Sequence, residues 1–279
     1  MILVIGATGK VGGSAVRHLG DGGHRVRALT RDPSKVATGP GLEAAFGDID
    51  RAETLPPAME GVDAVFLVAG GWDIPGEEAN VIGAAEAAGV RHIVLCSSLG
   101  VEHNVASGPF HRPGEERLRA SSLSWTILRP SVYMANALMW AESIKAQGVF
   151  YEPTGDGAHA MIHHDDIGAV AATVLTGDGH EGRTYELTGP AAVTAAQCAE
   201  TLSAVLGRPV QHVDVSDEAF RAGMSASGAP EVLVDSLARY YAMVKAGDFA
   251  MVTATVPELV GRPGHTFENW ATENVAAFG

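Results

Sequence analysis

The chain has 279 residues, of which 46% are hydrophobic and 19% are charged. This composition is typical of a folded protein large enough for one big α/β domain, or for one domain and a smaller lobe, and it excludes a disordered chain. Its 19 basic and 33 acidic residues give a formal net charge of −14, which repels phosphate polymers and anionic membrane surfaces. We therefore expect neither nucleic acid nor a membrane as a direct partner.

Short apolar runs alternate with helical patterns from residue 1 to about residue 150, which predicts right-handed βαβ units and a parallel sheet. The runs are almost continuously apolar, as strands buried on both faces should be. The predicted strands are Ile2–Ile5, Arg25–Leu29, Leu42–Phe46, Ala64–Val68, His92–Ser97 and Ser124–Leu128. The predicted helices are Val11–Leu19, Arg51–Met59, Glu77–Ala88, Gly114–Ser121 and Asn136–Gln147, with Gly20, Gly61 and Gly89 where helices would end. The fold class expected is a Rossmann-type, doubly wound α/β domain.

Beyond residue 150 the alternation loosens, which predicts a smaller C-terminal α/β substrate lobe over residues 151–279, partly interleaved with the Rossmann domain of residues 1–150. The predicted elements are a helix capped by Asp165 or Asp166 and ending at Leu175, a strand Arg183–Leu187, a helix from Thr194 to Gly207, and helices over Pro230–Ala246 and Thr266–Ala277.

The N-terminus contains a glycine-rich turn, Gly6-Ala7-Thr8-Gly9-Lys10-Val11-Gly12, between the first predicted strand and the first helix. Gly6 allows the tight turn, Gly9 lets the backbone approach a pyrophosphate, and Gly12 permits close helix–strand packing. Thr8, Lys10 and Val11 belong to the same turn, where free helix amides would face the phosphates. The segment predicts a dinucleotide site.

The end of the second strand decides which nucleotide is favoured, because an acid there binds a ribose 2′-hydroxyl and an arginine a 2′-phosphate. Arg31 comes first and Lys35 follows one helical turn later, whereas Asp32 precedes Pro33 and is better placed to cap a helix. This pattern favours NADP(H), with NAD(H) as the alternative. After the third strand, Asp48 and Ile49 are expected to close over the adenine, although Asp48 could instead cap a helix.

Several motifs together resemble the NmrA-like, or atypical, branch of the short-chain dehydrogenase/reductase superfamily. They are Gly6–Gly12, Arg31–Lys35, Gly47-Asp48, Ala88–Val94, Thr126–Pro130, Tyr185–Pro190, Leu206–Val210 and Gly261–Pro263. The resemblance implies a Rossmann domain with NADP(H) across the carboxyl ends of the strands and a small substrate lobe. It also implies one of two functions: NADPH-dependent reduction of quinones or triphenylmethane dyes, or nucleotide binding without turnover in regulators of transcription factors.

The residues that ordinary short-chain dehydrogenases use as a Tyr-x-x-x-Lys pair are absent. Ser97 and Ser98 end the fifth strand, and Ser98 would align with the catalytic serine, but the tyrosine position holds His111 and the lysine position Glu115. Alcohol oxidation and sugar epimerisation thereby lose their base. Hydride transfer to a conjugated acceptor needs mainly positioning and one weak acid. His111 could be that acid, or a surface or loop-ordering histidine.

Other residues are expected around the nicotinamide and the acceptor. Ala69 and Gly70 follow the fourth strand, and Ser97 and Pro130 end the fifth and sixth strands. The predicted acceptor contacts are Trp72, Tyr133 and Asn136. Trp72 could stack on a flat acceptor or pack as a lid, and Tyr133 could donate a proton or simply pack in the interior.

Metal, disulfide and membrane chemistry are not expected. Alternation would put His159 and His163 on one face of a strand, but the following acids, Asp165 and Asp166, are better explained as helix caps than as ligands. Cys96 and Cys198 lack metal or CxxC spacing, so both are expected to be reduced core thiols. The short apolar start and the absence of any run of about 18 apolar residues favour a cytoplasmic protein.

The leading hypothesis is therefore an NADPH-dependent reductase that transfers hydride to a quinone-like or other conjugated small molecule, acting as a monomer or homodimer. Two alternatives stay open. One is a non-enzymatic NADP(H) sensor that regulates a protein partner, and the other is an isomerase or dehydratase that uses His111 or Tyr133 as base.

Overall fold

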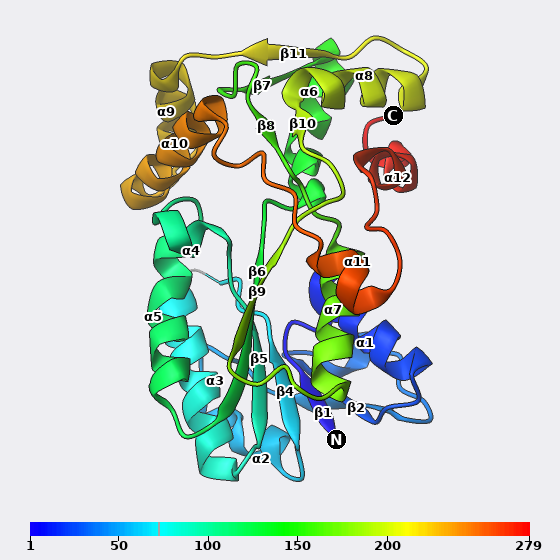
Figure 1. The fold of residues 1–279 in the computed structure, drawn as a ribbon, viewed down its shortest axis with the longest axis vertical. Helices are drawn as coiled ribbons and strands as arrows, with labels where there is room; N and C mark the ends of the chain where they lie inside the picture. The colour runs from blue at the N-terminus through cyan, green and yellow to red at the C-terminus, as the bar shows by residue number, and fades with distance from the viewer. Residues whose placement is uncertain (72) are drawn as a thin grey trace.

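The computed structural model describes residues 1–71 and 73–279, and its centre is a seven-stranded sheet in the order β3-β2-β1-β4-β5-β6-β9 (Figure 1). Every neighbouring pair in this sheet is parallel. The strands are β1 (Ile2–Val4), β2 (Val26–Thr30), β3 (Leu42–Phe46), β4 (Ala64–Leu67), β5 (His92–Cys96), β6 (Ser124–Pro130) and β9 (Arg183–Leu187). The chain order reverses between β1 and β4, where doubly wound sheets open a crevice for ligands. The predicted Rossmann-type fold is confirmed.

Helices cover both faces of this sheet (Figure 1). Alternate strand residues divide between two cores: Val4 and Phe66 pack with α1 and α7, and Leu3 and Val65 pack with α3. One face carries α1 (Lys10–Asp21), α7 (His164–Thr176) and α11 (Thr255–Val260), and the other carries α2 (Pro56–Met59), α3 (Ile74–Ala88) and α5 (Gly108–Ala120). Burial on both faces explains why the strand sequences are apolar at nearly every position.

Helix α7 packs tightly against α1 although the two are far apart in sequence. A Cβ atom at Gly168 would lie only 2.4 Å from the Ser14 hydroxyl oxygen, so glycine permits this close approach. Asp165 accepts a hydrogen bond from Ser14 at 2.6 Å and forms an ion pair with Arg17. Helix α7 and strand β9 thus return residues beyond 150 to the Rossmann sheet. The division of the chain into domains at residue 150 stays a prediction.

The remaining elements form the upper part of the molecule in Figure 1. Strand β11 pairs with β7 in parallel, and β10 pairs with β8 antiparallel. The core here contains Trp140 stacked on Phe150, with ring centroids 4.0 Å apart, and the fully buried Trp270. The elements are α6 (Ala141–Gln147), β7 (Val149–Glu152), β8 (Ala158–His159), β10 (Val193–Thr194), α8 (Ala195–Leu206), β11 (Gln211–Asp214), α9 (Asp217–Ala226), α10 (Glu231–Ala246) and α12 (Phe267–Glu273).

Short helices complete the chain and account for several boundaries that the sequence misplaced. They are the α-helix α4 (Gly100–His103) and the 3₁₀ helices η1 (Pro33–Lys35), η2 (Ala52–Thr54), η3 (Met134–Trp140) and η4 (Val275–Ala277). The helix predicted over Arg51–Met59 is divided at Leu55 because Pro56 and Pro57 cannot continue the hydrogen bonding of η2. The helix predicted over Asn136–Gln147 begins as η3, and α1 continues past Gly20 to Asp21, with Gly22 as its C-cap.

Helix caps explain two further comparisons with the sequence. Thr194 caps α8 with a complete capping box, and Asp32 accepts a hydrogen bond from the Ser34 amide at the start of η1, both as predicted. The expectation that Asp165 or Asp166 caps α7 is wrong. The N-cap is His163, whose Nδ1 accepts from the Asp165 amide. The Asp165 carboxylate binds helix α1, and the Asp166 carboxylate binds the segment between α11 and α12.

Candidate active site

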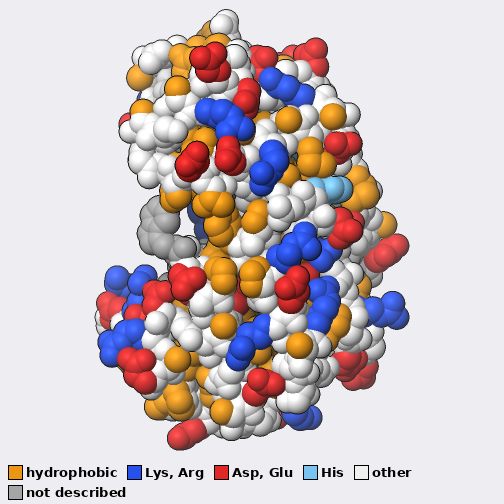
Figure 2. Space-filling view, turned by 90° about the vertical axis from the view of Figure 1, so that its left-hand side faces the viewer, with side chains coloured by type: hydrophobic (Ala, Val, Ile, Leu, Met, Phe, Trp, Pro, Cys, Tyr) orange, Lys and Arg blue, Asp and Glu red, His pale blue; other side chains and the backbone are white. Residues whose placement is uncertain are grey.

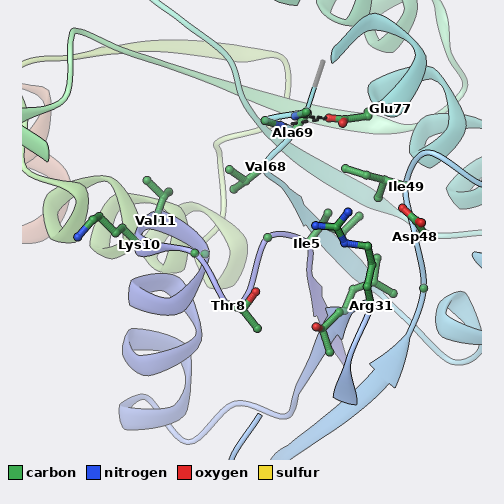
Figure 3. Close-up of a pocket in the computed structure, with 18 of the residues that line it drawn as sticks. Ile5, Thr8, Lys10, Val11, Arg31, Asp48, Ile49, Val68, Ala69 and Glu77 are labelled. Atoms are coloured by element: carbon green, nitrogen blue, oxygen red, sulfur yellow. Dashed lines mark hydrogen bonds between the residues drawn. The ribbon is translucent and has the colours of Figure 1, made fainter. Parts of the chain in front are cut away.

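A cavity of about 580 Å³ opens where the carboxyl ends of β1, β2 and β4 meet (Figure 3). It lies beside the glycine turn, at the position that doubly wound sheets use for nucleotides. Twelve residues predicted to bind the cofactor line it: Gly6, Thr8, Gly9, Lys10, Val11, Gly12, Arg31, Lys35, Asp48, Ile49, Ala69 and Gly70. The structure therefore brings together four loops that are separate in sequence.

The glycine turn has the geometry that a pyrophosphate requires. A Cβ atom at Gly12 would lie 2.2 Å from the Gly6 carbonyl oxygen, and Gly6 has a φ of +72°. The α1 helix starts after Gly9 with no side chain capping its first amides. Free amides at a helix N-terminus attract phosphate oxygens. The residues present therefore fit a dinucleotide.

Arg31 extends from the end of β2 into the cavity, between Thr8 and Asp48 in the view of Figure 3. Among the described residues its guanidinium has no hydrogen-bond or ion-pair partner, so it is available to a ligand. Lys35 lies near the same rim, with its Nζ 3.8 Å from an Asp32 carboxylate oxygen. Asp32 is held by Ser34, whose hydroxyl donates to it at 2.6 Å, and this bond lowers the pKa of Asp32.

Glu77 shapes the opposite wall, a role that the sequence did not reveal. Its Oε2 atom accepts hydrogen bonds from the amides of Gly70 and Gly71, both at 3.1 Å (Figure 3). The side chain is only 2% exposed, and a Cβ atom at Gly71 would lie 1.7 Å from its Oε1 atom. Glu77 therefore fixes the loop after β4, and glycine is required where the carboxylate meets it.

A second cavity, of about 560 Å³, joins the first at Ala69, Gly70 and Tyr133, which line both. Figure 2 shows that the surface is hollowed between the upper and lower parts of the molecule, with hydrophobic side chains gathered in the hollow. Among the residues predicted for the site, Ser97, Ser98, His111, Pro130, Tyr133 and Asn136 line this second cavity. Ser97 and Pro130, expected at the cofactor, thus lie on the acceptor side of the junction. Trp72 lies outside the described residues.

His111 is a buried residue of α5 rather than a surface histidine. Its Nδ1 atom lies 2.7 Å from Oε1 of Glu78, and the two side chains are 8% and 0% exposed. The other oxygen of Glu78, Oε2, has no hydrogen-bond partner among the residues described and faces Gly114, where a Cβ atom would be 1.6 Å away. Burial raises the pKa of Glu78, and hydrogen bonding to His111 opposes that effect.

Glu115, in the position of the missing lysine, belongs to an ion-pair network one helical turn after His111. It accepts from the Ser97 hydroxyl at 2.6 Å and pairs with Arg129 and Arg119 at 2.7 and 2.8 Å. Burial alone would raise the pKa of Glu115, but these hydrogen bonds outweigh it and lower the pKa. Glu115 thus holds the ends of β5 and β6 together as a carboxylate.

Tyr133 and Ser98 have neighbours that limit their chemistry. The Tyr133 hydroxyl lies 3.6 Å from the Cys96 sulfur, and burial raises the pKa of this phenol well above its usual value. The Ser98 hydroxyl accepts from the Gly100 amide at 3.2 Å, at the start of α4. Asn136 is exposed at the mouth of the cavity.

The far end of the second cavity contains four polar side chains from β7, β8 and α10, which sequence reasoning did not bring together. His159 Nδ1 lies 2.9 Å from the Tyr240 hydroxyl, and the Tyr241 hydroxyl donates to Oε1 of Glu152 at 3.4 Å. All four residues line the cavity. Burial raises the pKa of Glu152 to about 7 and lowers that of His159 to about 4.

His159 and His163 do not share a strand face, which corrects the expectation from their spacing. His159 ends β8 in the acceptor cavity, whereas His163 caps α7 and lies 3.1 Å from Glu273. Asp166 binds Arg262 and His265 at 2.7 and 2.8 Å. Within residues 1–71 and 73–279, no group of three or more His, Cys, Asp or Glu side chains is arranged to hold a metal ion.

His164, which follows His163 in the histidine and aspartate cluster weighed as a metal site, lines the nucleotide cavity beside Lys10. Burial, the neighbouring His163 and the Lys10 charge lower the pKa of His164 to about 4, so its imidazole is neutral at physiological pH.

No helix among the described residues is both long enough and apolar enough to span a bilayer.

Comparison with known proteins agrees with this geometry. Residues 6–178 match a family model described as NAD(P)H-binding. The chain is 38% identical to an NAD(P)H azoreductase of Xenophilus azovorans, over 100% of this chain and 99% of that protein. It is 40% identical to a (4-alkanoyl-5-oxo-2,5-dihydrofuran-3-yl)methyl phosphate reductase of Streptomyces griseus, over the same shares of the two chains.

Among solved structures, an NADPH-dependent quinone oxidoreductase of Escherichia coli in complex with NADPH superposes with a TM-score of 0.88 at 30% identity, covering 99% of this chain and 100% of that one. The agreement extends over both the sheet and the upper part of the molecule. The chain therefore belongs to the NAD(P)H-binding family of Rossmann-fold proteins and is an NAD(P)H-dependent oxidoreductase.

Proposed function

We propose that this protein uses NADPH to reduce quinones and related conjugated molecules, such as azo and triarylmethane dyes. The observation that carries the proposal is the junction of the two cavities at Ala69, Gly70 and Tyr133, because it opens a mainly apolar acceptor site directly onto the nucleotide site. The names of an azoreductase and a quinone oxidoreductase among the relatives support the same acceptor class. When bound, NADPH supplies the hydride.

Different residues of the chain would bind the nucleotide and the acceptor. The amides of the glycine turn hold the pyrophosphate, and Arg31 attracts a 2′-phosphate, which favours NADPH over NADH. The loop fixed by Glu77 forms the wall beside the junction. The apolar residues of the second cavity, among them Ala137, Met161 and Phe249, would shield a flat acceptor from water. Such positioning supplies most of the rate acceleration for hydride transfer.

Reduction of a quinone also consumes a proton, and we assign its delivery to His111. Its Nδ1 atom is engaged by Glu78, which leaves Nε2 as the nitrogen able to serve the acceptor cavity. Tyr133 is less suited, because its buried phenol has a raised pKa and lies beside the Cys96 thiol. Cys96 itself is buried and its pKa is raised to about 11, so it stays a thiol.

The test is to mix the purified protein with NADPH or NADH and a panel of quinones, azo dyes and triarylmethane dyes, following the absorbance of the reduced nicotinamide. Acceptor-dependent oxidation that is faster with NADPH is expected. Tight nucleotide binding without turnover of any acceptor would overturn the proposal and favour the redox-sensor alternative.

A further inference from the structure

Glu152 is a buried acid that has no role in the reaction proposed above. It ends β7 at the far end of the acceptor cavity, opposite the junction with the nucleotide site, and is 7% exposed. Its Oε1 atom accepts one long hydrogen bond, from Tyr241 at 3.4 Å, and the Trp140 side chain also lies within hydrogen-bonding reach of the carboxyl. Among the described residues its Oε2 atom has no partner within hydrogen-bond distance. An unsatisfied carboxyl costs stability when it is removed from water.

The neighbours of Glu152 do not neutralise it. Tyr241, Tyr240 and His159 are the titratable groups beside it that line the cavity, and Cys198 lies behind it with its pKa raised by burial and by the Glu152 charge. Burial keeps His159 uncharged, and no arginine or lysine is among the residues lining this cavity. Among the described residues the carboxyl therefore has no cationic partner.

The rest of the cavity is mainly apolar, with walls from Leu233, Leu237, Met224 and Phe220 of α9 and α10. An acceptor that reaches from the junction to β7 would meet apolar side chains along its length and a hydrogen-bond acceptor at its end. Binding sites commonly combine an apolar body with a few placed polar groups that select the ligand.

We propose that Glu152 forms a recognition subsite for a hydrogen-bond donor, an aromatic amino or hydroxyl group, at the end of the acceptor remote from the hydride. The inference rests on the proposed function because it places the reacting end of the acceptor at the junction. Tyr241 orients the carboxyl through Oε1, which leaves the carboxyl one free acceptor position. A charged acceptor for an N–H or O–H group strengthens binding by about 10-fold or more.

The experiment measures binding rather than turnover, so that failure of the reductase proposal and failure of this subsite are distinguishable. Protein saturated with NADP⁺ is titrated with 4-aminoazobenzene and with 4-methylazobenzene, in which a methyl group replaces the donor at similar size. The titrations are made at about pH 8, where the Glu152 carboxyl is mostly ionised. Wild type should bind the amino compound about 10-fold more tightly, and Glu152→Leu should bind both equally.

Two further variants keep the test decisive. Glu152→Gln preserves the shape of the side chain but replaces a charged acceptor with a neutral one, so the preference should fall severalfold even if the leucine variant folds poorly. Glu142→Gln changes an exposed acid of α6 and should keep the full preference. Equal binding of the two dyes by wild type, or a preference that survives in Glu152→Leu, would overturn the proposal.

Discussion

The Nδ1 atom of His111 lies 2.7 Å from the Oε1 atom of Glu78, and both side chains are shielded from solvent. The two residues belong to α5 and α3, and the contact spans 33 positions of sequence. Because the carboxyl fixes one ring nitrogen, it also fixes the orientation of the imidazole. We propose that this pair, rather than a Tyr–Lys couple, is the acid–base group at the wall of the acceptor cavity.

Replacing His111 should affect acceptors according to whether they need a proton. A quinone takes one hydride and one proton to become a hydroquinone, whereas a triarylmethane cation takes only the hydride to become a neutral product. We expect His111→Gln to lower kcat for a quinone by about 100-fold and to change kcat for the cationic dye by less than about 3-fold. Steady-state kinetics with both acceptors makes the comparison within one protein.

Two variants control for simple loss of structure at this pair. Glu78→Gln keeps a hydrogen bond to the imidazole but removes the charge, and should lower the quinone rate less than His111→Gln does. Tyr133→Phe should leave the ratio of the two rates unchanged. An equal loss on quinone and dye in His111→Gln would show that His111 only packs.

Removing the Arg31 guanidinium should abolish the preference for the phosphorylated nucleotide. Arg31 lines the nucleotide cavity and has no partner in the part of the chain that the structure describes, so an ion pair with a 2′-phosphate would break no contact seen there. Arg31→Ala should weaken NADPH binding by about 10- to 100-fold and leave NADH binding nearly unchanged. Fluorescence titration with both nucleotides gives the two dissociation constants.

Nearby basic residues provide the controls for this measurement. Lys35→Ala should have a smaller effect, because Lys35 is already close to Asp32. Arg51→Ala alters an exposed arginine that pairs with Glu53 outside the cavity, and should affect neither nucleotide. Comparable losses of NADPH and NADH binding in Arg31→Ala would contradict a role in selecting the phosphate.

The nucleotide side of the site could be predicted from the sequence because its signals are local. Gly6, Gly9 and Gly12 lie within one turn, and Arg31 follows its strand directly, so strand order alone brings them together. The acceptor side depends on contacts between distant segments: His159 meets Tyr240 across 81 positions and Glu152 meets Tyr241 across 89. The hydrophobic pattern of a single segment cannot predict contacts between segments so far apart in sequence.

The misplaced helix boundaries have equally specific causes. The helix predicted over Gly114–Ser121 already begins at Gly108 and continues through Pro113. Glu77 was predicted as the first residue of a helix, whereas α3 begins at Ile74 and the loop after β4 folds back over the buried Glu77 side chain. In both cases tertiary packing decided the outcome over local propensity.

Glu77→Gln should weaken nucleotide binding without changing the selection between NADPH and NADH. One carboxylate oxygen accepts from both Gly70 and Gly71. A glutamine amide that turns its NH₂ toward them would repel both donors, and in the opposite orientation it offers only a neutral, weaker acceptor. Loosening the loop beside the nicotinamide should raise both dissociation constants by about 10-fold, since the loss of buried hydrogen bonds costs about 1–2 kcal/mol. Glu86→Gln, on the same helix but away from the cavity, is the matched control. Unchanged binding in Glu77→Gln would mean that the loop is held by other contacts.

Glu152 should make the protein less stable as the pH rises. The pKa of this carboxyl is about 7 in the folded protein and about 4.5 when unfolded, so between these values the unfolded chain loses a proton that the folded protein retains. The group therefore destabilises the fold progressively from about pH 4.5 to about pH 7, by about 3 kcal/mol in total. Glu152→Leu removes this titration and also the unsatisfied carboxyl.

The measurement is the free energy of unfolding in urea, for wild type and Glu152→Leu, at several pH values from about 5 to about 8. The difference between the two proteins should increase with pH and become constant above about pH 7. His159 does not mimic this signal, because its folded pKa of about 4 makes the protein less stable as the pH falls, opposite in sign. Tyr240 and Tyr241, whose pKa values are raised, stay neutral throughout. A difference that is constant over the whole range would show that Glu152 ionises normally in the folded protein, and that its carboxyl is solvated rather than held ready for a ligand.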